Sequence, residues 1–313
     1  MARVLITRPL PDEWLRPLVD AGHESHWRSA QPLSHAEILA AAADFAAIIC
    51  TITDPIDEAV LSSGAGQLRA VGNIGVGYDN IDVAAAGRYG VAVCNTPGVL
   101  DETTADLAFL LLLAASRRAS DAEATLRAGE WDGFRIGAFL GNDIHGATLG
   151  IVGFGRIGQA VARRAAGFGM TVLHHSRRHT SAAGYVADLD DLLGRADAIS
   201  LHVPLTAQTR HLIDERRLRL MGPQAVLVNT SRGPVVDEVA LAVALEQDHI
   251  FGAGIDVYER EPAVHPRLLA APNTVLLPHI GSATERTRRR MAQLACEGVV
   301  AVLAGRTPPN LVG

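Results

Sequence analysis

The segment that most constrains the fold of this chain is "ATLGIVGFGRIG", close to its middle. It places Gly153, Gly155 and Gly158 in Gly-x-Gly-x-x-Gly spacing, between an apolar run that predicts a strand and "RIGQAVARRAAGFG", which predicts a helix. The next apolar run, "TVLHHS" at 171–176, predicts a second strand. In such a β-α-β unit the three glycines permit a tight turn, the approach of a pyrophosphate to the backbone, and close packing of the helix on the strand. The segment therefore predicts dinucleotide binding at a helix N-terminus.

Short apolar runs alternate with helical segments along the rest of the chain. They predict strands at residues 3–7, 45–51, 68–75, 91–96, 148–153, 171–176, 198–203, 225–230, 252–257 and 274–280. Long helices are predicted near 102–131 and within 284–305. This alternation is typical of mostly parallel sheets with helical crossovers. Because 313 residues exceed what one hydrophobic core usually serves, two domains are expected.

Composition and charge argue against several partners. The formal net charge is −6, without the basic excess that nucleic acid or an anionic membrane attracts. The first apolar run ends at Arg8, so no signal peptide is expected, and the longest apolar run, 107–115, is too short to span a bilayer. Cys50, Cys94 and Cys296 fit neither a disulfide framework nor a metal knuckle. A protein of the reducing cytoplasm is expected.

The basic residues restrict the chemistry further. All 28 of them are arginine. The absence of lysine excludes mechanisms that need a Schiff-base lysine, a phosphate-loop lysine or a Tyr-x-x-x-Lys dehydrogenase pair. Several common classes of oxidoreductase and kinase are thereby excluded.

The residues after the second strand of the β-α-β unit bear on the choice of cofactor. An acid normally stands about 20 residues after the first glycine and accepts hydrogen bonds from the ribose of NAD. Here Ser176, Arg177 and Arg178 occupy that place. A 2′-phosphate carries a charge of roughly −1.5 to −2, and arginine can bind it with a bidentate fork. The stretch predicts NADP(H) with NAD(H) as the alternative, unless the two arginines are merely solvated.

Six motifs along nearly the whole chain resemble the D-2-hydroxyacid dehydrogenase family. They are "GNIGVGYDNID" (72–82), "NTPG" (95–98), "GFGRIG" (153–158), "NTSRG" (229–233), "GIDVYEREP" (254–262) and "LPHIGSAT" (277–284). Their order and spacing are similar to those of the family. The glycine motif, the "SRR" after it and the segment "PHIGSATERTR" are most similar to the glyoxylate/hydroxypyruvate reductases.

The resemblance implies an active site of three residues. Arg232 matches the family's substrate-binding arginine, Glu261 its carboxylate partner and His279 its proton-donating histidine. A guanidinium can hold the carboxylate and the neighbouring carbonyl of a 2-oxo acid, and an imidazole exchanges protons near neutral pH. A carboxylate on the other ring nitrogen favours the charged imidazolium. Without the resemblance, His279 would be interpreted as structural and Glu261 as a solvated acid.

The resemblance also implies binding roles for further residues. The backbone amides of Val76 and Gly77 would hold the substrate carboxylate, although a glycine needed only for the shape of the turn is the alternative. Asp256 matches an acid on the nicotinamide side, and it could equally cap a turn. No metal site is expected, since His175 and His179 fall on a strand end and a loop. The expected cofactor site comprises Gly153, Gly155, Arg156, Ile157, Gly158, Ser176, Arg177, Arg178 and Asp256.

The fold implied by the resemblance is α/β, with two doubly wound parallel-sheet domains. A flavodoxin-like substrate-binding domain of residues 1–97 and 285–313 would carry an inserted Rossmann domain of residues 98–284. NADPH would reduce a small 2-oxo acid, glyoxylate or hydroxypyruvate, to a D-2-hydroxy acid. A homodimer is expected through the helix near 102–131, with neither nucleic acid nor a membrane as partner. The alternatives are a 2-ketoaldonate reductase, a phosphoglycerate-type dehydrogenase and, in another class, a dinucleotide-sensing corepressor.

Overall fold

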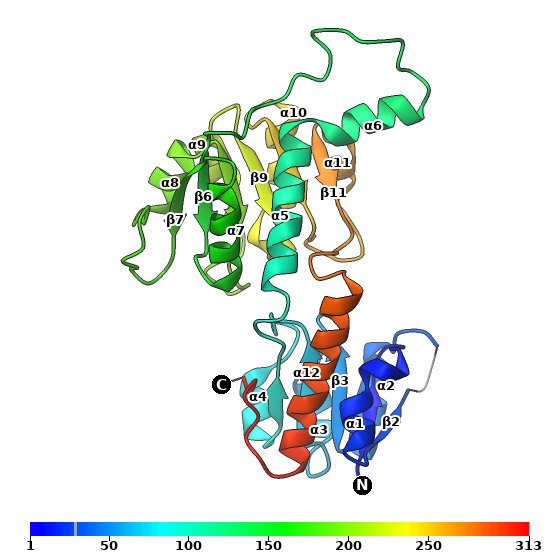
Figure 1. Ribbon diagram of the computed structural model, residues 1–313. Helices are drawn as coiled ribbons and strands as arrows, with labels where there is room; N and C mark the ends of the chain where they lie inside the picture. Colours follow the sequence, from blue (N-terminus) through cyan, green and yellow to red (C-terminus); the bar gives the residue numbers. More distant parts are fainter. Residues whose placement is uncertain (28–29, 313) are drawn as a thin grey trace. The chain divides into compact units, whose positions relative to one another are not determined.

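The computed structural model describes residues 1–27 and 30–312. The chain divides into two compact units (Figure 1). The first comprises two segments, Met1–Leu100 and Ser282–Gly313, and the second, Asp101–Gly281, lies between these two segments in the sequence. These divisions lie close to the expected boundaries at residues 97 and 285. In the part of the chain that is described, no helix is long and apolar enough to cross a membrane.

The first unit contains a five-stranded parallel sheet. Its strands are β1 (Arg3–Ile6), β2 (Glu24–His26), β3 (Ala47–Thr51), β4 (Ala70–Ile74) and β5 (Ala92–Cys94). They lie in the order β2-β1-β3-β4-β5, which is the flavodoxin-like order. The sequence did not predict β2, because this short edge strand, Glu-Ser-His, has no buried residue and hence no apolar pattern.

Helices cover both faces of this sheet. They are α1 (Arg16–Asp20), α2 (His35–Ala41), α3 (Glu58–Ser63), α4 (Val83–Arg88) and α12 (Glu285–Leu303), with 3-10 turns at Asp12–Trp14 and Ala42–Asp44. The helices α2, α3 and α4 share one buried apolar cluster with the sheet, and α1 and α12 share the other. The α12 helix confirms the single amphipathic helix predicted for the final segment, since buried residues such as Met291, Ala295 and Val299 recur at helical spacing.

The second unit contains a six-stranded parallel sheet. Its strands are β6 (Thr148–Val152), β7 (Thr171–His175), β8 (Ala198–Leu201), β9 (Val226–Asn229), β10 (Gly252–Ile255) and β11 (Thr274–Leu276). They lie in the order β11-β10-β9-β8-β6-β7, and an isolated parallel bridge places Tyr185 beside His174 of β7. With Tyr185 standing for a third strand, this is the strand order of dinucleotide-binding sheets. The prediction of two doubly wound parallel sheets is confirmed.

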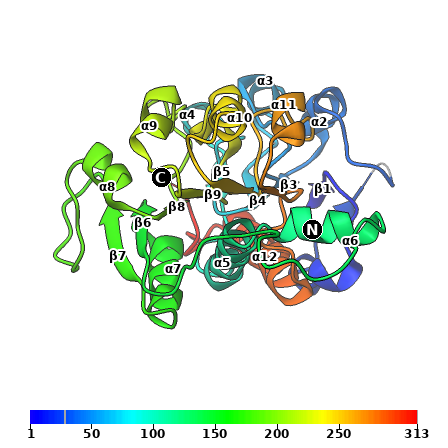
Figure 2. The same ribbon diagram turned by 90° about the horizontal axis from the view of Figure 1, so that it is seen from above.

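The helices of the second unit also form two layers. They are α5 (Asp101–Ser116), α6 (Ala119–Arg127), α7 (Arg156–Ala166), α8 (Leu189–Arg195), α9 (Glu215–Leu220), α10 (Glu238–Glu246) and α11 (Pro266–Ala270), with a 3-10 turn at Gly233–Val235. Figure 2 shows α5 and α7 on one side of the sheet and α8 to α11 on the other, and each group shares a buried apolar cluster with the strands.

The single long helix predicted near 102–131 is wrong. The α5 helix ends at Ser116, and Arg118 adopts the left-handed conformation with φ 51° before α6 begins. Residues other than glycine rarely adopt this left-handed conformation. An ion pair between the Arg118 guanidinium and Asp121, at 3.0 Å, holds the local turn. Figure 1 shows α6 and the loop after it extending away from the sheet of this unit.

Candidate active site

The glycine-rich loop joins β6 to α7, and its glycines have different surroundings. Gly153 adopts φ 97°, and a Cβ there would lie 2.4 Å from the carbonyl oxygen of His202. A Cβ on Gly158 would lie 2.2 Å from the carbonyl oxygen of Gly153, whereas a Cβ on Gly155 would meet nothing within 4 Å. The protein's own backbone therefore requires the first and third glycines. The open space beside Gly155, at the N-terminus of α7, fits an anionic pyrophosphate.

Substitution of two of these glycines is expected to separate folding from cofactor binding. Gly155→Ala should leave the free energy of unfolding within about 0.5 kcal/mol of wild type, because its Cβ meets no protein atom. The same Cβ would occupy the pyrophosphate's place, so the dinucleotide Kd should rise about 10-fold or more. Gly153→Ala should instead destabilise the fold by about 1–3 kcal/mol, because it forces an unfavourable φ and a clash with His202. Denaturant unfolding measures the free energy of unfolding, and a fluorescence titration measures the dinucleotide Kd. A Gly155→Ala variant that binds the dinucleotide as tightly as wild type would contradict the assignment of Gly155 to the pyrophosphate site.

The other residues predicted to bind the cofactor lie on α7 and after β7. Arg156 and Ile157 form the first turn of α7. Ser176 follows β7, and its hydroxyl donates to the carbonyl oxygen of Arg178 at 2.7 Å. Arg177 and Arg178 are exposed, and within the described residues neither guanidinium forms an ion pair. Both charges therefore face solvent, where a phosphate can reach them and where two merely solvated arginines would also lie.

The three residues predicted to be catalytic lie at one edge of the second unit's sheet. Arg232, Glu261 and His279 follow β9, β10 and β11, three neighbouring parallel strands. Ligands of open parallel sheets bind at the carboxyl ends of the strands. His279 Nδ1 lies 2.8 Å from Glu261 Oε2, and no described residue forms a hydrogen bond with Nε2. The structure thus brings the acid and the imidazole together and leaves the second ring nitrogen for a ligand.

The electrostatics of this edge favour an ionised Glu261. Burial alone would raise the pKa of its carboxyl group, but the hydrogen bond and charge of His279 oppose burial. The backbone amide of Tyr258, 3.1 Å from Oε1, and the charge of Arg232 act in the same direction. The pKa of Glu261 is therefore lowered overall. At neutral pH the group is a carboxylate that accepts a hydrogen bond from the imidazole and orients the ring.

Arg232 stands in a turn that the chain holds tightly. The buried side chain of Asn229 accepts from the backbone amide of Ser231 at 3.0 Å and donates to the carbonyl oxygen of Arg232 at 2.9 Å. The next residue, Gly233, has no space for a Cβ, which would lie 1.9 Å from the carbonyl carbon of Tyr258. The turn that carries Arg232 is thereby packed against the loop that leads to Glu261.

Asp256 has a structural role that the resemblance did not specify. Its carboxylate is buried and accepts from the amides of Ile280 at 2.7 Å and Gly281 at 2.8 Å, and its carbonyl oxygen accepts from the amide of His279 at 2.9 Å. Burial raises its pKa to about 6, against the lowering effect of these amides and of the His279 charge. Asp256 thus caps the turn that carries His279, which was the alternative to a place beside the nicotinamide. That place stays a prediction.

Val76 and Gly77 belong to the first unit, in the loop after β4. The carbonyl oxygen of Gly77 accepts from Asn73 Nδ2 at 2.8 Å, and that of Val76 accepts from Asn95 Nδ2 at 2.8 Å. Among the described residues, nothing accepts a hydrogen bond from the amide of either residue. Because their carbonyl groups are held by the protein, the two amides are left for a ligand, as the prediction of a carboxylate site requires.

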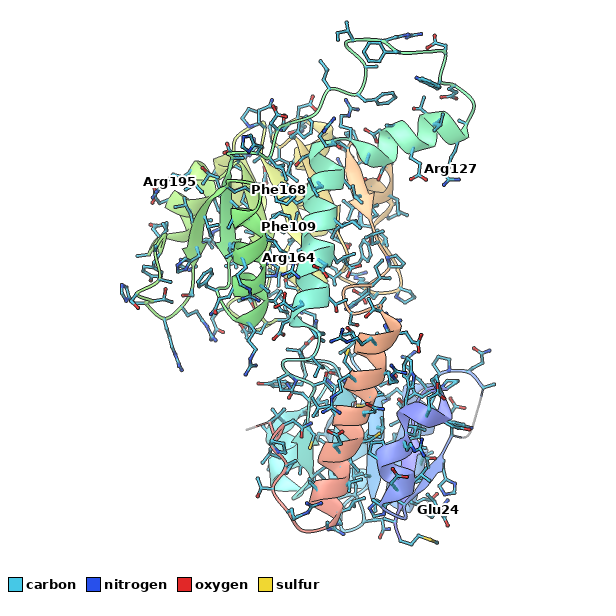
Figure 3. All side chains as sticks on the ribbon, in the orientation of Figure 1. Glu24, Phe109, Arg127, Arg164, Phe168 and Arg195 are labelled. Carbon is cyan, nitrogen blue, oxygen red and sulfur yellow. The ribbon has the colours of Figure 1, made fainter. Side chains whose placement is uncertain are left out.

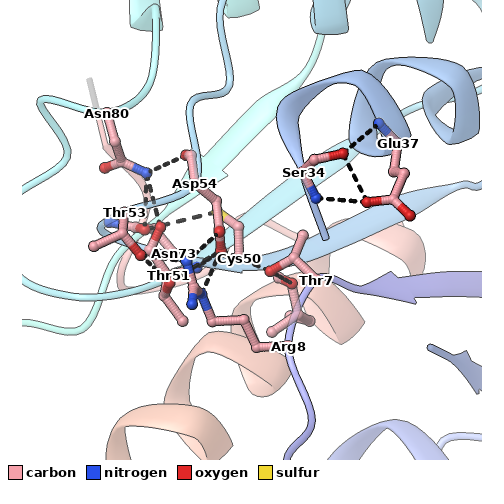
Figure 4. A network of polar contacts seen from close by, with 11 residues as sticks. Thr7, Arg8, Ser34, Glu37, Cys50, Thr51, Thr53, Asp54, Asn73 and Asn80 are labelled. Atoms are coloured by element: carbon pink, nitrogen blue, oxygen red, sulfur yellow. Dashed lines mark hydrogen bonds and ion pairs between the residues drawn. The ribbon is translucent and has the colours of Figure 1, made fainter. Parts of the chain in front are cut away.

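A polar network at the carboxyl ends of β1, β3 and β4 holds Asn73 in place (Figure 4). Asn80 Nδ2 lies 3.4 Å from Asn73 Oδ1 and donates to the carbonyl oxygen of Asp54 at 3.0 Å. The buried Asp54 carboxylate in turn pairs with Arg8 at 2.8 Å and accepts from Thr7 at 2.7 Å. Sequence reasoning missed these residues. The one signal was Asn73 itself, an amide in the run "LRAVGNIG" where the residues after Arg69 are otherwise apolar.

The fold and this site define a class: a dinucleotide-binding α/β protein with an acid-paired histidine and an arginine at the ligand-binding edge of the same sheet. Residues 109–281 match the family described as D-isomer specific 2-hydroxyacid dehydrogenase, NAD binding domain. The chain belongs to this family, and its second unit contains the family's NAD-binding domain.

Named relatives extend the similarity over the whole chain. Glyoxylate reductases from Thermococcus litoralis and Korarchaeum cryptofilum are 45% and 47% identical, covering 99% of this chain and 96% and 95% of their own. A solved structure of an NADPH-dependent glyoxylate/hydroxypyruvate reductase from Sinorhizobium meliloti, in complex with NADP and malonate, is 36% identical with a TM-score of 0.88. That similarity covers 99% of this chain and 96% of the other.

Proposed function

We propose that this protein is an NADPH-dependent reductase of small 2-oxo acids, with glyoxylate and hydroxypyruvate as preferred substrates and a D-2-hydroxy acid as product. The observation that carries the proposal is the hydrogen bond of 2.8 Å between His279 Nδ1 and Glu261 Oε2, at the same strand edge as Arg232. A family member with this trio has the groups that reduction of a 2-oxo acid needs. The three relatives reported above are reductases of glyoxylate, and this similarity supports the choice of substrate.

Each residue of the trio has a separate task in this proposal. Arg232 holds the substrate carboxylate and polarises the neighbouring carbonyl. His279 gives a proton from Nε2 to the oxygen of that carbonyl, and Glu261 orients the ring through its hydrogen bond with Nδ1. The dinucleotide, when bound, supplies the hydride that reduces C2. The amides of Val76 and Gly77 add hydrogen bonds to the carboxylate.

The proposal also assigns the two units and the setting. The first unit is the substrate-binding domain, and the second binds the dinucleotide through Gly153, Gly155, the first turn of α7 and the residues after β7. The protein works in a reducing cytoplasm, since Cys50, Cys94 and Cys296 are free and buried.

A panel of substrates tests the proposed function. Initial rates with NADPH and NADH would be measured for glyoxylate, hydroxypyruvate, a 2-ketoaldonate and 3-phosphohydroxypyruvate. The highest kcat/KM is expected for glyoxylate or hydroxypyruvate with NADPH. A preference for the 2-ketoaldonate or the phosphorylated acid would favour one of the other two reductases. Tight dinucleotide binding with no turnover of any of them would identify a corepressor-like binding protein.

The cofactor preference can be tested by reversing it. If Arg177 and Arg178 bind the 2′-phosphate, wild type should prefer NADPH in kcat/KM by about 10- to 150-fold, since one charge-assisted hydrogen bond is worth about 1.5–3 kcal/mol. Exposure weakens such bonds, so added salt should narrow the preference. Replacing Ser176 with Asp and Arg177 with Ala should favour NADH, because the new carboxylate accepts from the ribose hydroxyls and repels the phosphate.

The measurement is kcat/KM with both cofactors at fixed salt. A control for the loss of one positive charge is Arg195→Ala, which removes the same charge as Arg177→Ala but from α8, where Arg195 pairs with Asp191 at 2.8 Å. The control should keep the wild-type ratio of the two cofactors. A wild type that prefers NADH, or a double variant with the wild-type ratio, would show that the two arginines are merely solvated.

We propose further that two copies of the chain associate through the outer side of α5, α6 and the loop after α6. A hollow of about 640 Å³ lies beside α5 and is lined by Phe109, Phe168 and Arg164 among others. Figure 3 labels these three side chains, on α5, just after α7 and on α7 respectively. In the loop, Phe134 and Ile136 are 85% and 86% exposed. Large exposed apolar side chains of this kind mark an interface, and the second copy predicted from the sequence is the expected occupant.

Light scattering behind size exclusion tests this assembly. Wild type is expected at twice the chain mass of 33.1 kDa. Replacing both Phe134 and Ile136 with Ser should raise the dimer Kd about 100-fold or more, since each buried side chain of this size contributes roughly 1.5–3 kcal/mol. The control, Val239→Ser, changes a 45%-exposed residue on α10 and should stay dimeric. A monomeric wild type at high concentration would contradict the proposal.

A further inference from the structure

Two glutamates outside the trio bind each other's backbone beside the loop that carries Glu261. The amide of Glu238 donates to Glu259 Oε1 at 3.1 Å, and the amide of Glu259 donates to Glu238 Oε1 at 3.1 Å. Glu238 is the first residue of α10, and Glu259 lies in the loop after β10. Two carboxylates placed this way close a reciprocal clamp between a helix N-terminus and a loop, and the helix dipole favours negative charge there.

A histidine completes the clamp from a third segment. His211 Nε2 lies 3.0 Å from Glu259 Oε1, and His211 Nδ1 lies 3.8 Å from Asp237 Oδ2. Its backbone amide donates to the carbonyl oxygen of Pro234 at 2.7 Å. Glu259 Oε1 therefore accepts from both α10 and the segment before α9, so one oxygen atom joins three parts of the second unit.

The clamp fixes backbone that leads directly to the catalytic residues. Tyr258, next to Glu259, donates its amide to Glu261 Oε1 at 3.1 Å, while Glu261 Oε2 bonds to His279. On the other side, the Tyr258–Glu259 peptide lies against Gly233, the neighbour of Arg232. Movement of this peptide would displace the carboxylate that orients His279 and would loosen the turn that carries Arg232.

We propose that Glu259, held by Glu238 and His211, is a positioning residue that sets the geometry of the Glu261–His279 pair, a role that rests on the proposed function. Glu259 touches none of the trio's side chains in the contacts above and acts through the backbone of residues 258–261. Loss of the clamp lets this loop relax, so the imidazole is no longer held in one orientation. A misplacement of about 1 Å can lower a rate by about 10²-fold.

The test compares Glu259→Ala with Glu259→Gln. Alanine removes the acceptor for two hydrogen bonds, and we expect kcat to fall about 10- to 100-fold, with KM for glyoxylate and the NADPH Kd within about 2-fold of wild type. Glutamine keeps an oxygen acceptor of the same length and should retain more than about half of kcat. The matched control is Glu246→Ala, which removes a carboxylate from the other end of α10, where it pairs with Arg267 on the surface. It should leave kcat unchanged.

A second readout does not depend on turnover. The proton that His279 Nδ1 donates to Glu261 is expected to give a low-field NMR resonance, which is assigned by its loss in His279→Ala. It is expected in wild type, Glu259→Gln and Glu246→Ala, and lost to exchange in Glu259→Ala. A folded Glu259→Ala that keeps both this resonance and the wild-type kcat overturns the proposal. A wild type without turnover would refute the proposed function instead, and the resonance would still decide whether Glu259 positions the pair.

Should Glu259→Ala fail to fold, His211→Ala provides the same test. The His211 side chain is 40% exposed, so its removal leaves little buried space. It removes the contact with Glu259 and the longer one with Asp237, but leaves the two backbone bonds between Glu238 and Glu259 in place. The kcat should therefore fall about 3- to 10-fold, with the resonance broadened. Wild-type values of both would overturn the proposal.

Discussion

Replacement of His279 with alanine is expected to lower kcat by about 10²–10⁴, the usual contribution of a positioned acid or base, with the NADPH Kd nearly unchanged. The reason is the geometry of the pair. Glu261 binds Nδ1 at 2.8 Å, so the ring has a fixed orientation and only Nε2 is left to exchange a proton with a ligand. Alanine removes the proton donor and leaves the glycine-rich loop of Gly153, Gly155 and Gly158 untouched.

The measurement is steady-state kinetics with glyoxylate, together with a fluorescence titration of NADPH. His145→Ala serves as the control, because it removes an exposed histidine whose Nδ1 lies 3.2 Å from the carbonyl oxygen of Phe168, and it should keep the wild-type kcat. If a correctly folded His279→Ala retained more than about half of the wild-type kcat, His279 would have no part in proton transfer.

The sheets of both units were largely predictable from the sequence. A buried parallel strand is apolar on both faces, so it appears as a continuous run such as "TLGIVG", which contains β6, and the runs alternate with helical segments. Where burial is missing, that signal is missing too, which is why the polar β2 was not predicted. The break at Arg118 was missed for the opposite reason, because apolar and helix-forming residues continue through it. The left-handed conformation belongs to the backbone of Arg118 alone, and an arginine in the sequence does not predict such a conformation.

The site divides in the same way. Arg232, Glu261 and His279 follow strand ends, and the sequence places strand ends well. The roles of Asp256 and Glu259 depend instead on which backbone amides the folded loops bring to them, and no spacing in the sequence encodes that. Glu259 lies in the motif "GIDVYEREP" among other charged residues, and sequence alone does not distinguish an acid with its half-buried contacts from a solvated acid.

Arg232→Lys is expected to lower kcat/KM for glyoxylate by about 10- to 150-fold, although the positive charge is retained. One ammonium cannot reproduce a planar fork across a carboxylate and its neighbouring carbonyl, so at least one charge-assisted hydrogen bond worth about 1.5–3 kcal/mol is lost. We expect KM to rise and kcat to fall together, because the same group binds the substrate and polarises the reacting carbonyl. Lysine also places its charge differently beside Glu261, whose lowered pKa depends partly on Arg232.

The backbone around this position should tolerate the change. Asn229 holds the turn through the carbonyl oxygen of Arg232 and the amide of Ser231, neither of which the substitution alters. Unfolding in denaturant should therefore match wild type, and the NADPH Kd should stay within about 2-fold, since the dinucleotide site after β6 and β7 is unchanged. The control is Arg219→Lys, an equal substitution at an exposed pair with Glu215 at 2.8 Å, which should keep wild-type kinetics. Glyoxylate kinetics that barely change in Arg232→Lys would make Arg232 a structural residue of the strand end, and the proposed hold on the substrate carboxylate would be wrong.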